Sequence, residues 1–156
     1  MIEIKCDSGN NVIVEGNSLA GVCLDGQNLH RAMLDECDLS GATLNNADLR
    51  SASLERAILF RCELRQAHLF GAWAKSASFE ETRCYGAKMN CANLNEANFR
   101  NSELSFVDFS QANLRGTDFT GAMFENATFH DAEYDALTKW PVDVDPRQLG
   151  AKFSAS

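Results

Sequence analysis

Large apolar residues recur every five positions along most of this chain, and a small residue stands two positions before most of them. Between positions 19 and 134 the large column contains 24 residues in unbroken phase, of which 14 are Leu and six are Phe; Ala fills 15 of the small positions. Helices repeat about every 3.6 residues and strands about every two, so neither element alone fits a period of five. Residues two apart share one face of an extended segment. We therefore predict short extended sides, joined by corners, with both columns pointing inward.

Glycine marks the corners. All eight Gly between positions 16 and 121 stand two places after the large column, and Asn46, Asn101 and Asn126 share that phase. Gly adopts a positive φ without steric cost, and Asn tolerates it better than most residues do. The corner position is therefore predicted to be left-handed.

Charged residues indicate how many sides make one coil. In a coil of n residues, residue k stacks on residue k+n, where opposite charges attract and like charges repel. Between positions 14 and 136, a separation of 20 gives eight opposite pairs and two like pairs, whereas 15 gives three and six, and 25 gives six and six. The opposite pairs at 20 are Glu36/Arg56, Glu55/Lys75, Arg61/Glu81, Glu63/Arg83, Glu80/Arg100, Arg83/Glu103, Lys88/Asp108 and Arg115/Asp135. We predict four five-residue sides per coil, and about six coils. The first side ends at Leu19, the second at Leu24, the third at Leu29 and the fourth at Leu34, and the order then repeats.

The pattern of Ala, Asp or Asn, Leu and two further residues, as in Ala47-Asp48-Leu49 and Ala92-Asn93-Leu94, resembles the pentapeptide-repeat proteins. The resemblance covers residues 17–136. It implies an all-β solenoid, a right-handed quadrilateral parallel β-helix, which agrees with the four-sided coil that the charges favour. The tail TKWPVDVDP (138–146) is similar to a segment that follows the repeats in many cyanobacterial members.

The ends of such a stack need caps, because they expose unpaired strand edges. We predict an N-terminal cap at 1–13, the repeats at 14–136 with Val12 and Val14 as a degraded repeat, and a C-terminal cap at 137–156. The residues expected to cover the last coil are Leu137, Trp140, Val142, Leu149 and Phe153.

Candidate chemistry is sparse. His30, His68 and His130 fall on the third side, two and three coils apart, which is too far for a shared metal or an acid–base pair. Cys37, Cys62 and Cys84 occupy inward positions and are expected to be buried thiols, with a Cys62–Cys84 disulfide left open; Cys23 and Cys91 are expected to be more exposed. No nucleophile triad or phosphate-binding loop occurs, and a filled core leaves no substrate cavity. We expect no enzyme activity, no metal and no cofactor.

Net charge and hydropathy limit the classes of partner that we expect. A net charge of −8 argues against direct nucleic-acid binding, which requires Lys and Arg on phosphates. No apolar run approaches the roughly 20 residues of a membrane span, and the N-terminus does not resemble a secretory signal. We therefore expect a cytoplasmic protein whose partner is another protein, with a weak homodimer left open.

Outward-facing apolar residues in the middle coils supply a candidate interaction surface. Its members are Phe60, Arg65, Phe70, Trp73, Tyr85 and Phe106. Phe60 and Phe70 lie on opposite sides of the square, so one patch cannot hold both. Two compact sets remain: Phe70 with Trp73 at one corner, or Arg65, Tyr85 and Phe106 on the second side. Scattered surface apolar residues are the plainer interpretation.

Two functions follow. The first is a non-catalytic interaction module, because some cyanobacterial relatives regulate cell differentiation by binding partners. The alternative is protection of DNA gyrase, since some family members mimic DNA with an acidic rod. Against the alternative, the acidic residues lie toward the ends, no loop interrupts the repeats, and the C-terminal tail does not resemble a dimer-forming helix.

Overall fold

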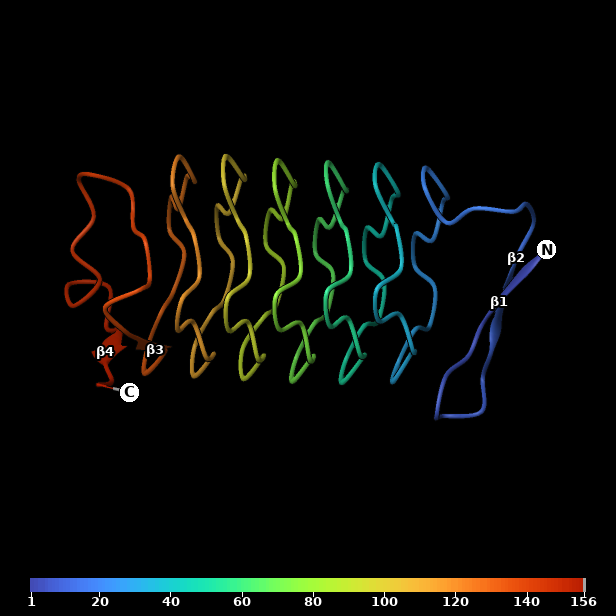
Figure 1. Cartoon of the computed structure of the whole chain (residues 1–156), viewed down its shortest axis with the longest axis horizontal. Coiled ribbons are helices and arrows are strands. Elements are labelled where there is room, and N and C mark those ends of the chain that lie inside the picture. The colour runs from blue at the N-terminus through green and yellow to red at the C-terminus, as the bar shows by residue number, and fades with distance from the viewer. Residues whose placement is uncertain (156) are drawn as a thin grey trace.

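The chain forms a rod of stacked coils with a hairpin at one end and an irregular tail at the other (Figure 1). The structure is a computed structural model and describes residues 1–155. Parallel backbone bridges join residues 20 apart, from Cys23 with Thr43 through Asn113 with Glu133. The bridges thus have the 20-residue spacing that the charged pairs favour.

Each rung of a ladder is a single residue, the one between the small and large columns. On the second side, the Thr43 N–H donates to the Val22 carbonyl at 2.9 Å, and the Leu24 N–H donates to the Thr43 carbonyl at 2.7 Å. Corners interrupt each side too soon for longer strands to form. The regular strands are only β1 (Ile2–Ile4), β2 (Val12–Val14), β3 (Glu133–Tyr134) and β4 (Lys152–Phe153) within the described residues. The expected β-helix thus appears as four ladders of isolated bridges, and its right-handedness stays a prediction.

The corner position is left-handed throughout the repeats, as predicted. Every residue at this phase from Gly16 to Asp131 has a positive φ, and 16 of them are not glycine, with φ between 55° and 60°. The corner therefore accepts side chains such as those of Arg56 and Phe106, at the steric cost that L-residues incur there.

The core is the pair of columns that the sequence predicts. In the large column every residue from Leu19 to Tyr134 is buried except Phe124, which is half-buried. Phe79 stacks on Phe99 with ring centroids 4.6 Å apart, and Phe99 stacks on Phe119 at 5.4 Å. Identical large residues in successive coils thus continue one aromatic column along the rod.

The N-terminal end is a β-hairpin, which corrects the prediction of a degraded repeat there. β1 pairs antiparallel with β2, so Ile2 faces Val14 and Ile4 faces Val12. The predicted boundary between residues 13 and 14 falls inside β2. Past β1, the Lys5 carbonyl accepts the Met33 N–H at 2.8 Å, which fastens the hairpin to the first coil.

The C-terminal tail rejoins the stack at two places. Lys139 continues the first-side ladder as the partner of Asp118, and β4 pairs parallel with β3 on the fourth side. Trp140 extends the aromatic column by stacking on Phe119 at 5.0 Å. The expected cap is correct for the half-buried Trp140 and Leu149, whereas Phe153 reaches Tyr134 with ring centroids 5.5 Å apart but remains 57% exposed. It is wrong for Leu137 and Val142, which are 74% and 100% exposed.

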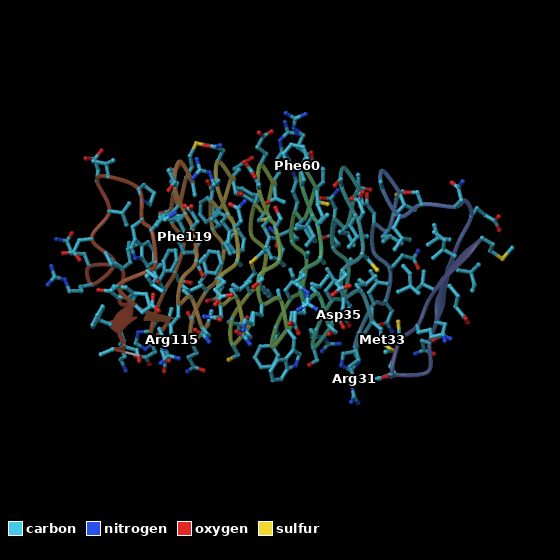
Figure 2. The ribbon with its side chains drawn as sticks, viewed as in Figure 1. Arg31, Met33, Asp35, Phe60, Arg115 and Phe119 are labelled. Carbon is cyan, nitrogen blue, oxygen red and sulfur yellow. The ribbon has the colours of Figure 1, made fainter. Side chains whose placement is uncertain are left out.

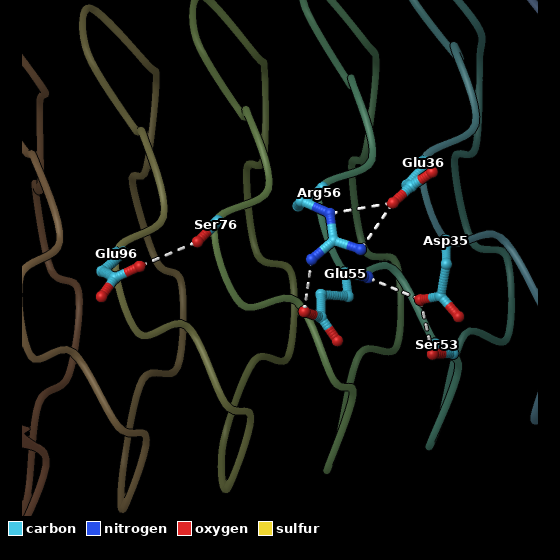
Figure 3. Close-up of polar contacts among 7 residues, drawn as sticks. All are labelled: Asp35, Glu36, Ser53, Glu55, Arg56, Ser76 and Glu96. Atoms are coloured by element: carbon cyan, nitrogen blue, oxygen red, sulfur yellow. Dashed lines mark hydrogen bonds and ion pairs between the residues drawn. The ribbon is translucent and has the colours of Figure 1, made fainter.

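Three of the eight charge pairs predicted at a separation of 20 form ion pairs. They are Arg56–Glu36 at 2.5 Å, Arg61–Glu81 at 2.6 Å and Arg83–Glu63 at 2.6 Å. Figure 3 shows Arg56 bridging Glu36 and Glu55, and Ser76 donating to Glu96. The other five do not form among the described residues, and in two of them the arginine reaches a diagonal neighbour instead. Arg115, for example, contacts Glu133 at 2.8 Å instead of Asp135.

Candidate protein-binding surface

Trp73 points away from the core on the fourth side. Its backbone is a rung of the ladder, because its N–H donates to the Ala52 carbonyl at 2.9 Å and its carbonyl accepts the Leu54 N–H at 2.7 Å. Ala72 and Ala74 on either side are buried, so the intervening side chain must face outward. The indole is 60% exposed. The ladder thus fixes a large aromatic group on the surface.

Trp73 forms one wall of a shallow cavity of about 460 Å³. Met33 and Ser53 precede it in the same ladder, two coils and one coil earlier, and Met33 is 55% exposed. The remaining lining comes from the corner before the fourth side and from the hairpin: His30, Arg31, Ser51 and Asp7. Figure 2 shows Arg31 and Met33 together near the hairpin, on the edge of the rod opposite Phe60.

Backbone and side-chain bonds hold this cavity in shape. The Asp7 N–H donates to the Arg31 carbonyl at 3.1 Å. The Ser53 hydroxyl donates to Asp35 at 2.6 Å, and Asp35 also accepts the Glu55 N–H at 2.8 Å (Figure 3). Arg31 forms no ion pair within residues 1–155, so its guanidinium remains available to a ligand. We define the fourth-side surface as Trp73, Met33 and Arg31.

The other predicted surface residues do not line this cavity. Phe70 lies at the corner before the fourth side and is 46% exposed. Phe60 lies at the corner after the first side, where the Arg61 guanidinium carbon sits 4.8 Å from its ring centroid. One continuous belt of these residues does not form.

The second compact set is assembled only in part. Tyr85 and Phe106 contact each other with ring centroids 5.2 Å apart, and both are exposed. Arg65 follows the same second-side corner one coil earlier, but its Nε atom pairs with Glu63 at 3.3 Å. This set is therefore an exposed aromatic pair beside a neutralised arginine.

The thiols and imidazoles bring no reactive cluster together. All six Cys are free, which settles the question of a Cys62–Cys84 disulfide against a bond. Cys62 and Cys84 are fully buried, and burial raises the pKa of each thiol to about 12. Cys37 is half-buried, less than expected, while Cys23 and Cys91 are exposed. The imidazole of His130 contacts Asp131 at 3.3 Å. Across residues 1–155, no group of three or more His, Cys, Asp or Glu side chains could hold a metal ion, and no helix is long and apolar enough to cross a membrane.

Sequence reasoning found Trp73 but missed the residues that complete its cavity. Met33 and Ser53 could have been found, since they share the position of Trp73 at separations of 40 and 20. Asp7 could not, because the hairpin lies outside the five-residue pattern. Arg31 occupies a corner, and its position in the five-residue repeat does not predict which way its side chain points.

Comparison with known proteins finds a matching family and solved structures with a similar fold. The family model for pentapeptide repeats matches eight copies, over residues 18–50, 37–72, 77–116 and 102–133. No curated protein sequence matches.

Solved structures of pentapeptide-repeat proteins are similar to this chain. One, from the thylakoid lumen of Arabidopsis thaliana, is 23% identical with a TM-score of 0.50, over 84% of this chain and 70% of its own. HetL, involved in heterocyst differentiation regulation in the cyanobacterium Nostoc, is 21% identical with a TM-score of 0.40, over 86% and 79%. QnrB1, a plasmid-mediated fluoroquinolone resistance protein, is 18% identical with a TM-score of 0.37, over 90% and 88%. At these identities the likeness concerns the fold alone. Together with the 20-residue ladders, the family match shows that this chain belongs to the pentapeptide-repeat family.

Proposed function

We propose that this protein is a non-catalytic interaction module whose fourth-side surface binds another protein. The observation that carries the proposal is the 60% exposed indole of Trp73, held in place by the ladder beside an open cavity of about 460 Å³. Buried aromatic anchors contribute much of the energy at protein interfaces, often about 2 kcal/mol or more for the strongest. An outward Trp adds nothing to the core of this fold, so a partner is its most direct explanation.

The surface favours a partner segment that carries both apolar and acidic side chains. Trp73 and Met33 offer an apolar wall, and Arg31 offers a guanidinium without an ion pair among the described residues. A rigid four-sided rod, which we infer to be right-handed as in its family, loses little conformational entropy on binding.

Affinity retention from an extract of the source cells tests this proposal. The bait with both Trp73→Ala and Met33→Ala should lose a protein that the unchanged bait retains. The matched control carries Tyr85→Ala and Phe106→Ala, which removes the other exposed aromatic pair and should retain that protein. Equal retention by both double variants, or loss only in the control, would contradict the assignment of the surface.

Gyrase protection remains the competing function, and the net charge of −8 is the observation that favours it. The acidic charge is uneven along the rod, because residues 55–94 carry a net charge of +2 and residues 95–134 carry −5. We therefore expect that a large molar excess of the protein neither inhibits supercoiling by gyrase nor rescues it from a quinolone. Clear protection at micromolar protein would reverse the ranking of the two functions.

A further inference from the structure

The C-terminal end of the stack leaves two adjacent sides, the second and the third, without a last rung among the described residues. The first-side ladder continues when the Phe119 N–H donates to the Lys139 carbonyl at 2.8 Å, and the fourth-side ladder continues when the Lys152 N–H donates to the Ala132 carbonyl at 2.7 Å. Between these two points the tail swings outward past Pro141 and Pro146 and rejoins near Gly150, which accepts the Asp131 N–H at 2.9 Å. The second side is thus skipped, and so is the third, where Thr128 has no bridge partner in a following coil within residues 1–155.

The skipped second-side rung exposes one donor and one acceptor. One coil earlier, the Met123 N–H donates to the Ser102 carbonyl at 3.0 Å, and the Met123 carbonyl accepts the Leu104 N–H at 2.8 Å. The corresponding groups in the last coil are the Ala122 carbonyl and the Phe124 N–H. Neither has a backbone partner within residues 1–155. Such an edge is a template for a further strand.

A groove lies directly beside these two groups. It has a volume of about 310 Å³ and is lined by Ala122 and Phe124 on one wall and by Val144 and Leu149 of the tail on the other. Phe124 is also the one residue of the large column, among those described, that the core does not bury. The unfilled rung and the incompletely covered core therefore coincide.

The charge around the groove determines which kind of segment it favours. Asp143 lines it and forms no ion pair within the described residues, whereas Asp145 is already paired with Arg147 at 3.1 Å. Glu125 directly follows Phe124 and is also exposed without an ion pair in the described chain. Residues 115–134 carry a net charge of −3. An incoming strand is therefore favoured if it carries Lys or Arg.

We propose that this groove binds an extended, basic segment of a partner protein, which adds the missing second-side rung by β-augmentation. One residue of the segment donates its N–H to the Ala122 carbonyl and accepts the Phe124 N–H. The residues before and after it, one small and one large, cover the Phe124 ring as the repeat pattern does. A cationic side chain beside them meets Asp143. This site is separate from the fourth-side surface, and its test does not depend on that proposal.

A synthetic peptide tests the geometry directly. The probe is end-blocked lysine-glycine-alanine-lysine-leucine-lysine-glycine, carrying a fluorophore, and binding is followed by anisotropy. The first control peptide has a methyl group on the backbone nitrogen of the central lysine, which deletes the donor to Ala122. The second has glutamate in place of every lysine. Each control should bind at least tenfold more weakly. Binding of the N-methylated peptide as strong as that of the probe would overturn the proposal.

Two measurements on the protein complete the test. Amide hydrogen exchange of Phe124 should be fast in the free protein and at least tenfold slower with saturating probe, while that of Leu104, already bonded, should not change. Asp143→Lys should weaken probe binding at least tenfold, and Asp7→Lys, the same charge change at the other end of the rod, by less than twofold. The proposal fails if Phe124 exchange is unaffected by the probe, or if both variants weaken binding equally. Slow Phe124 exchange that depends on protein concentration without probe would assign the edge to a second copy instead.

Discussion

The Oδ1 atom of Asp118 accepts the backbone N–H of Thr120 at 2.9 Å, two residues further along the chain. The same contact joins Asp38 to Ser40 at 2.9 Å and Asp108 to Ser110 at 2.9 Å, and Asn98 makes it to Arg100 at 3.0 Å. The side chain thereby satisfies a corner N–H that the ladder leaves free. This explains why the repeat places Asp or Asn before its large residue.

Removing one such acceptor should lower stability modestly. We expect Asp38→Ala to reduce the free energy of unfolding by about 1 kcal/mol, the usual worth of one hydrogen bond. Asp38→Asn keeps an acceptor oxygen and should lose less. Urea denaturation of the three proteins measures both differences. Equal losses in the two variants would mean that the contact to Ser40 does not stabilise the corner.

Acid should destabilise the fold through these same carboxylates. Hydrogen bonds from Ser40 lower the pKa of Asp38, and those from Arg50 and Lys152 lower the pKa of Asp48 and of Asp131. Each folded-state carboxylate therefore binds fewer protons than in the unfolded chain, so its stabilisation is present above the unfolded pKa of about 4 and is lost as the pH falls through the folded pKa. The melting temperature should decline from pH 5 to pH 3. A constant or rising melting temperature over that range would contradict this.

The left-handed corners give a second stability test. Gly41 has a φ of 69°, and a Cβ atom added there would meet nothing within 4 Å, so the cost of Gly41→Ala is conformational alone. We expect a loss of about 1 kcal/mol in the free energy of unfolding. Gly41→Asn should cost less, because Asn tolerates this region. A Gly41→Ala variant as stable as the unchanged protein would contradict this prediction.

The two tryptophans should respond in opposite ways to truncation. Trp140 lies against Phe119, Phe124 and Phe129 with ring centroids 5.0 to 6.1 Å away, so Trp140→Ala opens the end of the core and should cost about 3 kcal/mol or more. Trp73→Ala removes an exposed side chain and should leave the melting temperature nearly unchanged. Thermal unfolding of both variants by circular dichroism compares them. A similar large loss in both would show that Trp73 is packing, and the fourth-side surface would then lose its anchor.

The repeating part of the molecule was predictable because the same sequence pattern recurs in each coil. The large column, the corner φ and the 20-residue period all follow from local patterns that recur through Leu19 to Tyr134. The ends were less accessible. Val14 has the spacing of a repeat but lies in a hairpin, where it pairs with Ile2.

The surface and the tail show the same limit. Trp73 could be placed outward from its phase alone, whereas the cavity beside it needs Asp7 from a segment without repeats. Leu137 and Val142 are apolar, as Trp140 is, and only the path of the tail decides which of them reaches the core. The open groove at Phe124 depends on that same path, so the five-residue pattern could not reveal it.

Photo-crosslinking at position 73 tests the central claim, that the fourth side binds a protein, most directly. Trp73 is replaced by the photoreactive residue p-benzoylphenylalanine, and cells of the source organism expressing the variant are irradiated. A control variant carries the same group at Glu103, a second-side rung that also faces outward. The account predicts a discrete adduct with one other protein at position 73 and none at 103. No adduct at position 73, or the same adducts at both positions, would contradict it.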